Sequence, residues 1–488
     1  MSTSVTGTGS VSSTGIGSGL DVTTIISKLM AVEQLPMTQL QNQASAFNAK
    51  LSSVGKMQSY FSALQTKSNA LTAPGMWSST TATSSDTASV KVSTGPDAAV
   101  GNYAVMVSNL AVGQTVTSAA LPSSTDTLSA GSLTIDIGSY NLGTPPEPFT
   151  AKSGTTPLTL TIGAGDTSLA SIRDKINGAN AGISASIVTD ASGARLSLRS
   201  KETGAENAFR ITVVEASDDG IAATGLSAVA YDANNANAAM TRSMAAANAN
   251  LTVNGIALTS ASNTLTNVID GLTIGLLKPT ATEANVTVAA DTASIKTAVT
   301  DFVTAFNTLA SFIGTQTAYN ADNKTGGAMQ GDQATLALQH QLRSVINEGS
   351  SASSTWSRLS EIGLTLKTDG TLDTNSTKLD NALGKLPDLK KLMANDGVSS
   401  ADSGFVRRFK NLADAALGSE GVFAVRSASI STSVSRNGKS QEAMQKRLDH
   451  TQARLQAQYS ALDTKMASLN ALSSYMTQQI TQSNRTTA

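Results

Sequence analysis

The chain has 488 residues, enough for about three domains that each bury a hydrophobic core. Charged residues make up 14% of it and the formal net charge is −1, so the sequence offers no basic surface and we expect no nucleic-acid partner. There is no cysteine, which excludes disulfide bonds and thiolate chemistry. No apolar run approaches the roughly 18 residues of a membrane-spanning helix, so we expect no membrane insertion.

The first part of the chain is predicted to form a tail and a short helix. Residues 1–19 are polar and glycine-rich, lack the features of a cleavable signal peptide and are expected to be disordered in the free protein. Residues 20–39 have the spacing of an amphipathic helix, with Asp21 as its N-cap and Pro36 interrupting the pattern. The sequence leaves open whether its apolar face packs against the chain itself or contacts another molecule; the predicted contacts are Leu20, Val22, Ile25, Ile26, Leu29 and Met30.

A long helix is predicted next, ending at about Leu71 before the Pro74-Gly75 pair. Apolar residues recur along it every seven positions, as on the packed face of a helical bundle. We interpret this face as internal core, made of Leu40, Phe47, Leu51, Val54 and Phe61.

From about Thr80 the apolar residues alternate with polar ones, which is typical of β-strands. One helix is predicted within this region, from Ser168 to Asn177, and the tract 232–250 is predicted to be a loop. We expect residues 79–124 and 250–284 to form a first β head domain. Residues 125–249 would be a second β head domain inserted into it.

Helical spacing returns at Asp291, with Phe302 and Phe306 on the buried face. A helical leg domain is predicted for residues 40–78 and 285–440, with one short β-hairpin. Its last helix would end at Ser435, before a turn at 437–440.

Residues 441–488 are predicted to form a C-terminal coiled-coil foot helix, because apolar residues again recur every seven positions. The sequence leaves open whether this seam meets the chain itself or another molecule; the predicted contacts are Leu448, Leu455, Tyr459, Leu462, Met466, Leu469, Met476 and Ile480. The fold class is therefore α+β and multidomain. A discontinuous helical coiled-coil or bundle stalk from both termini would carry two nested, mainly β head domains.

Near the start of the chain, Gly19-Leu-Asp to Ile26 is followed by Leu29-Met30 and Pro36. Further stretches of this kind are 101–111, 168–177, 183–188, 262–274, 302–309, 331–333, 359–364, 369–372 and 459–480. Taken together and in this order, they resemble the flagellar hook-associated protein 2 family, the flagellar cap proteins, over essentially the whole chain. Phe306 stands where the family more often has tyrosine.

The resemblance implies a structural, chaperone-like role without catalysis or cofactor. A ring of copies, expected to be a pentamer, would sit at the distal end of the flagellum and help exported flagellin subunits to fold and insert. Flagellin and the hook-filament junction proteins would be partners, and a cytosolic export chaperone would bind the C-terminal helices. The chain would be secreted by the flagellar type III system.

Two other functions fit parts of the sequence. An exported adhesin that binds host mucin or glycans through its head domains would account for the hydroxyl-rich residues 125–249. Ser53-Val-Gly-Lys56, Ser139-Tyr-Asn141 and Lys324-Thr-Gly326 occur in the order of a penicillin-recognising serine enzyme. The first lies on the long predicted helix and the third in a polar turn, so we interpret the match as coincidence. No metal site is expected, because neither histidine has a second ligand at suitable spacing.

Overall fold

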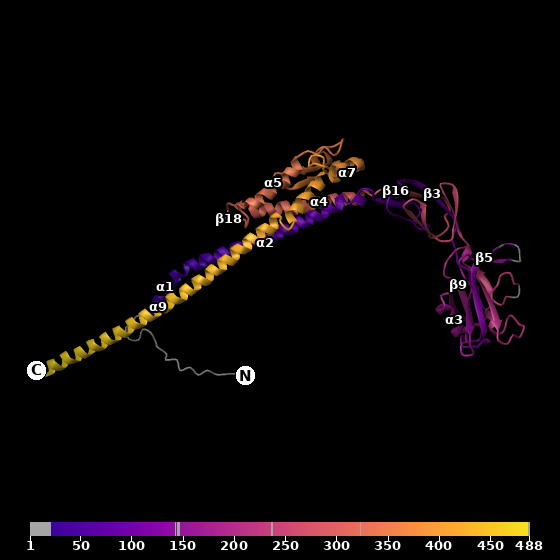
Figure 1. Ribbon diagram of the computed structural model, residues 1–488, viewed down its shortest axis with the longest axis horizontal. Coiled ribbons are helices and arrows are strands. Elements are labelled where there is room, and N and C mark those ends of the chain that lie inside the picture. Colours follow the sequence, from indigo (N-terminus) through magenta and orange to yellow (C-terminus); the bar gives the residue numbers. More distant parts are fainter. Residues whose placement is uncertain (1–20, 142, 144–146, 236–237, 323, 487–488) are drawn as a thin grey trace. The chain divides into compact units, whose positions relative to one another are not determined.

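The computed structural model describes residues 21–141, 143, 147–235, 238–322 and 324–486, so the predicted tail 1–19 and Leu20 lie outside the described residues. The chain forms two compact units (Figure 1). The helical unit combines the residues up to Trp77 with those from Ala293 onward, and the β unit spans Ser78–Thr292.

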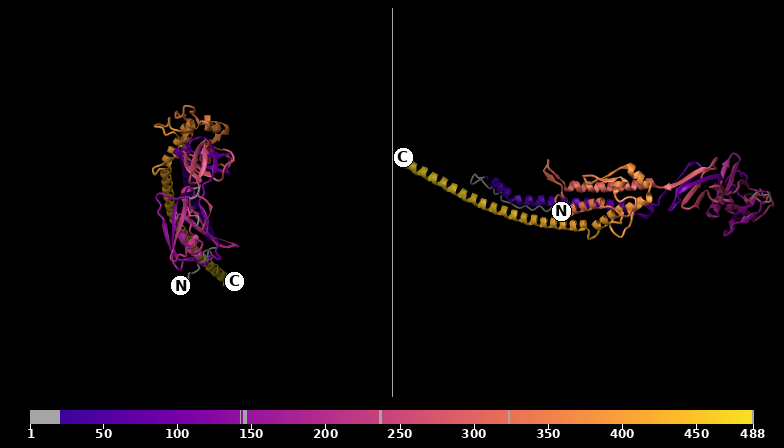
Figure 2. Two further views of the ribbon diagram at one scale, coloured as in Figure 1. Left: turned by 90° about the vertical axis from the view of Figure 1, so that its right-hand side faces the viewer. Right: turned by 90° about the horizontal axis from the view of Figure 1, so that it is seen from above.

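Helices from both ends of the sequence build the helical unit. They are α1 (Val22–Glu33), α2 (Leu35–Thr72), α4 (Thr292–Thr317), α5 (Gln333–Asn347), α6 (Ser376–Leu383), α7 (Leu386–Ala394), α8 (Phe405–Leu417) and α9 (Val422–Thr486). Two short hairpins accompany them: β17–β18 (Tyr319–Asn320 with Thr325–Gly326) and β19–β20 (Leu364–Leu366 with Leu372–Thr374). In the views of Figures 1 and 2, α1 and α2 lie along α9, and all three helices are in contact.

The core of the helical unit is rich in phenylalanine. Phe409 of α8 packs against Phe302 and Phe306 of α4, with ring centroids 5.4 and 5.5 Å apart. Phe61 of α2 meets Phe423 at the start of α9 with a centroid distance of 5.1 Å. Helices that are far apart in the sequence therefore share one core.

The junction between α1 and α2 lies at Gln34, two residues before Pro36. Pro36 falls in the first turn of α2, where its missing N–H costs nothing, but it prevents α1 from continuing. Asp21 caps α1, because its Oδ1 accepts a hydrogen bond of 2.9 Å from the backbone N–H of Thr24.

The first β core consists of two antiparallel sheets. Its strands are β1 (Thr80–Ser84), β2 (Val90–Thr94), β3 (Gly101–Asn109), β12 (Ala249–Val253), β13 (Ile256–Ser260), β14 (Thr264–Ile269), β15 (Leu272–Leu276) and β16 (Ala284–Ala290). One sheet has the order β1-β16-β3-β12-β13 and the other the order β14-β15-β2. Alternate residues such as Val286 and Val288 point into the core between them.

The inserted β core lies in sequence between β3 and β12. It contains β4 (Thr115–Thr117), β5 (Gly131–Tyr140), β6 (Phe149–Ala151), β7 (Leu158–Ile162), α3 (Leu169–Gly178), β8 (Ile183–Asp190), β9 (Gly193–Ser200), β10 (Ala208–Glu215) and β11 (Thr241–Met244). One sheet has the order β10-β5-β6, with β7 also on β5, and the other has the order β11-β4-β9-β8. This nesting, together with helices from both termini, confirms the predicted fold class.

The structure differs from the sequence-based boundaries at several places. Val116 of β4 belongs to the inserted core, so this core begins before residue 125. β16 pairs with β1 and β3, so residues 285–290 belong to the β unit and not to the leg. Strand β11 lies within the predicted loop 232–250. The turn predicted at 437–440 is instead helical, because α9 packs along α2 here and this packing outweighs weak local propensity.

Candidate assembly interface

The N-terminal helix α1 packs against α9. Met30 of α1, Met37 of α2 and Leu448 of α9 are buried together, with Ile26, Met444 and Leu455 packed around them. We call these six residues the foot cluster. It holds only a few side chains, whereas the helical core described above is large.

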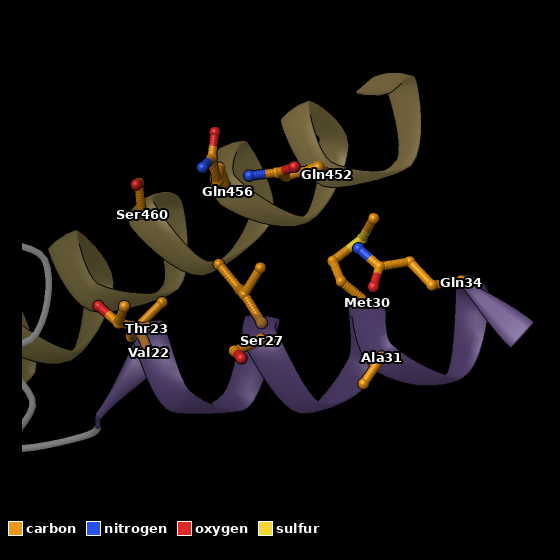
Figure 3. A pocket seen from close by; sticks show the side chains of 10 residues that line it. Val22, Thr23, Ser27, Met30, Ala31, Gln34, Gln452, Gln456 and Ser460 are labelled. Atoms are coloured by element: carbon orange, nitrogen blue, oxygen red, sulfur yellow. The ribbon is translucent and has the colours of Figure 1, made fainter. Parts of the chain in front are cut away.

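A groove opens beside the foot cluster (Figure 3). Val22, Thr23, Ile26, Ser27, Met30, Ala31 and Gln34 line it from the α1 side, and Gln452, Gln456 and Ser460 line it from α9. The α9 side chains end in amide and hydroxyl groups, and the α1 side is partly apolar. This lining carries no charged group, so it suits a helix with apolar and amide side chains better than an ionic ligand.

Beyond the groove, α9 continues with an uncovered apolar stripe. Leu462, Leu469, Met476 and Ile480 are 43%, 57%, 55% and 57% exposed. Their seven- and four-residue spacing places them on the face that buries Leu448. In Figures 1 and 2 this end of α9 extends past α1 with no other described helix beside it. The stripe is thus an unpaired continuation of a packed face.

An ion pair fixes the other end of α9. Asp332 caps α5 by accepting hydrogen bonds of 3.1 Å from the N–H and the hydroxyl of Thr335. Its second carboxylate oxygen binds the guanidinium of Arg426 on α9. The carboxylate therefore joins the start of α5 to the first part of α9.

Known proteins share the sequence features and the fold of this chain. Residues 18–114 match the description "Flagellar hook-associated protein 2 N-terminus", residues 246–471 match "Flagellar hook-associated protein 2 C-terminus", and residues 149–202 match "Flagellin hook IN motif". Flagellar hook-associated protein 2 of Escherichia coli K12 is 34% identical over 96% of this chain and 98% of its own length. The chain belongs to the flagellar hook-associated protein 2 family.

Other members of the family agree with this result. The B-type flagellar hook-associated protein 2 of Pseudomonas aeruginosa PAO1 is 31% identical over 92% of this chain and 93% of its own. The crystal structure of the D1-D2-D3 domains of the flagellar cap protein FliD from Escherichia coli superposes with a TM-score of 0.61 at 31% identity, covering 78% of this chain and 99% of that one. The resemblance seen in the sequence is confirmed.

Within this family fold, the predicted contact residues fall into three groups. Val22, Met30 and Leu448 are buried inside the chain, so they do not form a free contact surface as predicted. The reason is that α1 continues the direction of α2 along α9, and the apolar faces of α1 and α9 cover each other (Figure 1). The half-buried group is Ile25, Ile26, Leu455, Tyr459 and Met466, and the exposed group is Leu29, Leu462, Leu469, Met476 and Ile480.

The predicted leg residues also differ in burial. Val54, Phe61, Phe302 and Phe306 are buried in the large core, and Phe47 and Leu51 are half-buried against it. Leu40 is half-buried and belongs to neither the large core nor the foot cluster. It lies between these two regions of α2, which heptad spacing alone does not distinguish.

Exposed Leu472 and Tyr475 were missed by the sequence analysis. Leu472 lies beside the stripe, three positions after Leu469, whereas Tyr475 lies about 100° around the helix from Met476; both fall outside the seven-residue series that was used to select contacts. Leu472 therefore widens the stripe, and a count of all large apolar residues after Ser460 would have found both.

The serine-enzyme triplet has a structural explanation at its first residue. Ser53 is buried, and its hydroxyl oxygen lies 2.9 Å from both the Ala49 carbonyl oxygen and Oε1 of Gln316. It therefore helps to hold α2 against α4. Within the described part of the chain, histidine and acidic side chains nowhere gather in groups of three that could hold a metal ion. No helix in the described ranges is long and apolar enough to cross a membrane.

Proposed function

We propose that this chain caps the distal end of the bacterial flagellar filament and promotes the folding and insertion of exported flagellin, so that the filament elongates. The observation that carries the proposal is membership of the hook-associated protein 2 family over nearly the whole length, together with the likeness to a solved flagellar cap protein. The chain would act in the extracellular space, after export by the flagellar type III system.

The uncovered stripe on α9 supports an assembly role. Leu462, Leu469 and Met476 offer apolar area that the single chain leaves in water. We propose that this stripe contacts flagellin or other copies of the chain in a ring, which we expect to be a pentamer. The hook-filament junction proteins would be further partners, and an export chaperone would cover the same C-terminal helix before secretion.

A single charge on the stripe tests the proposal. Leu469 is 57% exposed, so Leu469→Asp should change the stability of the isolated chain by no more than about 0.5 kcal/mol. In the assembly the same aspartate would be buried at a cost of about 2–5 kcal/mol. We expect the variant to fold normally, to leave filaments short and to release flagellin into the medium of a cap-deficient strain.

Ala471→Asp is the matched control, because Ala471 is also exposed and lies two positions further on, toward the opposite face of α9. It should restore filament length as the wild-type chain does. Normal filaments with Leu469→Asp would remove the stripe from the mechanism. A cap-deficient strain that grows no filaments even with the wild-type chain, properly secreted, would contradict the capping function itself.

Glycan binding by the β unit is a second proposal. Strand β8 lies at the edge of its sheet and exposes Ser186 and Thr189, whose hydroxyl groups can donate hydrogen bonds to sugar oxygens. The measurement is binding of the purified full chain to immobilised mucin. Saturable binding that free glycans compete away supports an adhesin, and a flat response dismisses it.

A further inference from the structure

The contact between α2 and α9 is apolar at two places and polar between them. On one side Ile430 and Val434 of α9 belong to the large core, together with Phe47 and Leu51 of α2. On the other side Met444 and Leu448 of α9 belong to the foot cluster with Met37 of α2. The two hydrophobic regions share no residue.

Amide side chains fill the seam between these regions. Asn437 is buried, donates a hydrogen bond of 3.4 Å to Oε1 of Gln43 on α2, and accepts one of 2.7 Å from Nε2 of Gln441. The positions 430, 434, 437, 441, 444 and 448 follow alternating steps of four and three, so Asn437 and Gln441 occupy two successive layers of the seam. Neutral hydrogen bonds here contribute less than the apolar contacts they replace.

Intrinsic helix preference is also low at the same point of α9. Gly438 has no atom within 4 Å of the position where a Cβ would lie, so neither packing nor close approach requires glycine there. A glycine inside a helix costs about 1 kcal/mol relative to alanine. Ser435, Asn437 and Ser440 beside it are also poor helix formers.

We propose that Gln43, Asn437, Gly438 and Gln441 form a joint in the helical unit. At this joint α9 bends or opens locally, while the large core and the foot cluster each stay packed. Because the foot cluster also contains Met37 of α2, such a change of direction moves the end of α9 together with α1 and the start of α2, and α2 bends with α9 near Gln43. This inference concerns the free chain and does not rest on the proposed capping function.

Hydrogen exchange of the full-length chain tests the joint, because local opening lowers amide protection where it occurs. Ordinary fraying would make protection fall steadily along α9 toward its end. A joint instead gives a minimum at 437–441, with slower exchange on both sides, at 423–434 and at 444–450. A steady fall from Ile430 through Leu448 would overturn the proposal.

Two variants sharpen the test. Gly438→Ala should slow exchange at 437–441 by about fivefold, the factor that corresponds to the helix preference of alanine. Gly55→Ala is the control, since Gly55 is also helical and without an atom within 4 Å of its Cβ position; it is exposed, whereas Gly438 is half-buried, and it lies on α2 beside the large core. It should leave the minimum unchanged. Equal slowing by both variants, or no slowing by Gly438→Ala, would show that the minimum does not arise from this glycine and would refute the joint.

A third variant addresses the amide layers. Asn437→Leu with Gln441→Leu replaces the polar seam by apolar contact and should merge the two hydrophobic regions, which removes the minimum altogether. If the minimum survives in this folded variant, the amides do not create it and the joint as proposed is wrong. Filament growth is measured separately, so a negative result here leaves the capping function untouched.

Discussion

Removing the negative charge of Asp332 should loosen α9 from α5 and destabilise the helical unit. The Asp332 side chain is only 2% exposed, and Arg426 is 33% exposed. Loss of one partner from a fully buried ion pair costs about 3–5 kcal/mol. Because the guanidinium would regain part of its hydration, we expect about 2–3 kcal/mol for Asp332→Asn. Asparagine keeps the hydrogen bond that caps α5. Alanine loses this hydrogen bond as well as the ion pair, so we expect Asp332→Ala to cost about 1 kcal/mol more than Asp332→Asn.

Tryptophan fluorescence during urea unfolding measures this effect selectively. The chain has two tryptophans, Trp77 and Trp356, and both belong to the helical unit. Trp77 is buried and donates a hydrogen bond of 2.7 Å from its indole N–H to the Leu71 carbonyl, so its emission reports the folded state. The unfolding midpoint of this signal should move to lower urea in the order wild type, Asp332→Asn, Asp332→Ala.

A double-mutant cycle with Arg426→Met separates the ion pair from other effects of substitution. The double variant Asp332→Asn with Arg426→Met should lose clearly less stability than the two single losses summed, because neither charge is then left without its partner. Additive losses, or a change below about 0.5 kcal/mol for Asp332→Asn, would refute the argument that this pair fastens α9.

Three further predictions concern the foot cluster, the β unit and pH. Leu448→Ala should cost about 2–3 kcal/mol locally and speed hydrogen exchange in α1, because Leu448 fills the small foot cluster. Gly204→Ala should lower the melting temperature of the β unit, since φ is +104° at Gly204 and the new Cβ would lie 2.6 Å from Cβ of Ala261. Hydrogen bonds from Thr24 hold the pKa of Asp21 below its ordinary 3.8. The stability that this cap gives α1 is therefore fully present above pH 3.8 and is lost as the pH falls through the lower pKa of the folded state. Hydrogen exchange of the backbone amides at the start of α1 measures this loss.

Each of these has its own control. Leu472→Ala removes an exposed leucine of the same helix and should leave α1 unchanged; equal acceleration by both would mean that α9 responds as a whole. Gly165→Ala, at an open position of the β unit, should leave its melting temperature nearly unaltered, and a similar loss there would argue against strain at Gly204. Asp21→Asn caps without titrating. If its α1 shows the same acid dependence, another group is responsible.

Most of the fold could be predicted from the regular spacing of apolar residues. The heptads of α2 and the alternation in the β unit report which side chains are buried, and burial is what periodicity measures. The short strand β4 was misassigned because its place depends on β9, which lies far along the sequence, and three residues carry little pattern of their own. Pairing between distant segments leaves no local trace.

The contact residues on α9 were only partly predicted, because their exposure also depends on a segment that is distant in the sequence. The seam through Leu448 and Leu469 is continuous in the sequence, but each part is covered only as far as α1 lies along it, and α1 begins at Val22, beside Ser460 (Figure 3). Local propensity also misled at Gly438, where it favoured a turn and tertiary contact with α2 maintained a helix. The sequence alone therefore could not show which part of the stripe is exposed to solvent.

Pairing between β1 and β16 has a consequence for folding order. Thr80 and Ala290 are opposite each other in the sheet, so the folded β unit brings together the points where α2 leaves and α4 returns. Closing a loop costs more conformational entropy the longer the loop is. Once the β unit has folded, α2 and α4 are tethered like successive helices of a short hairpin. We therefore expect the β unit to fold first, because its folding lowers the entropic cost of bringing α2 and α4 together.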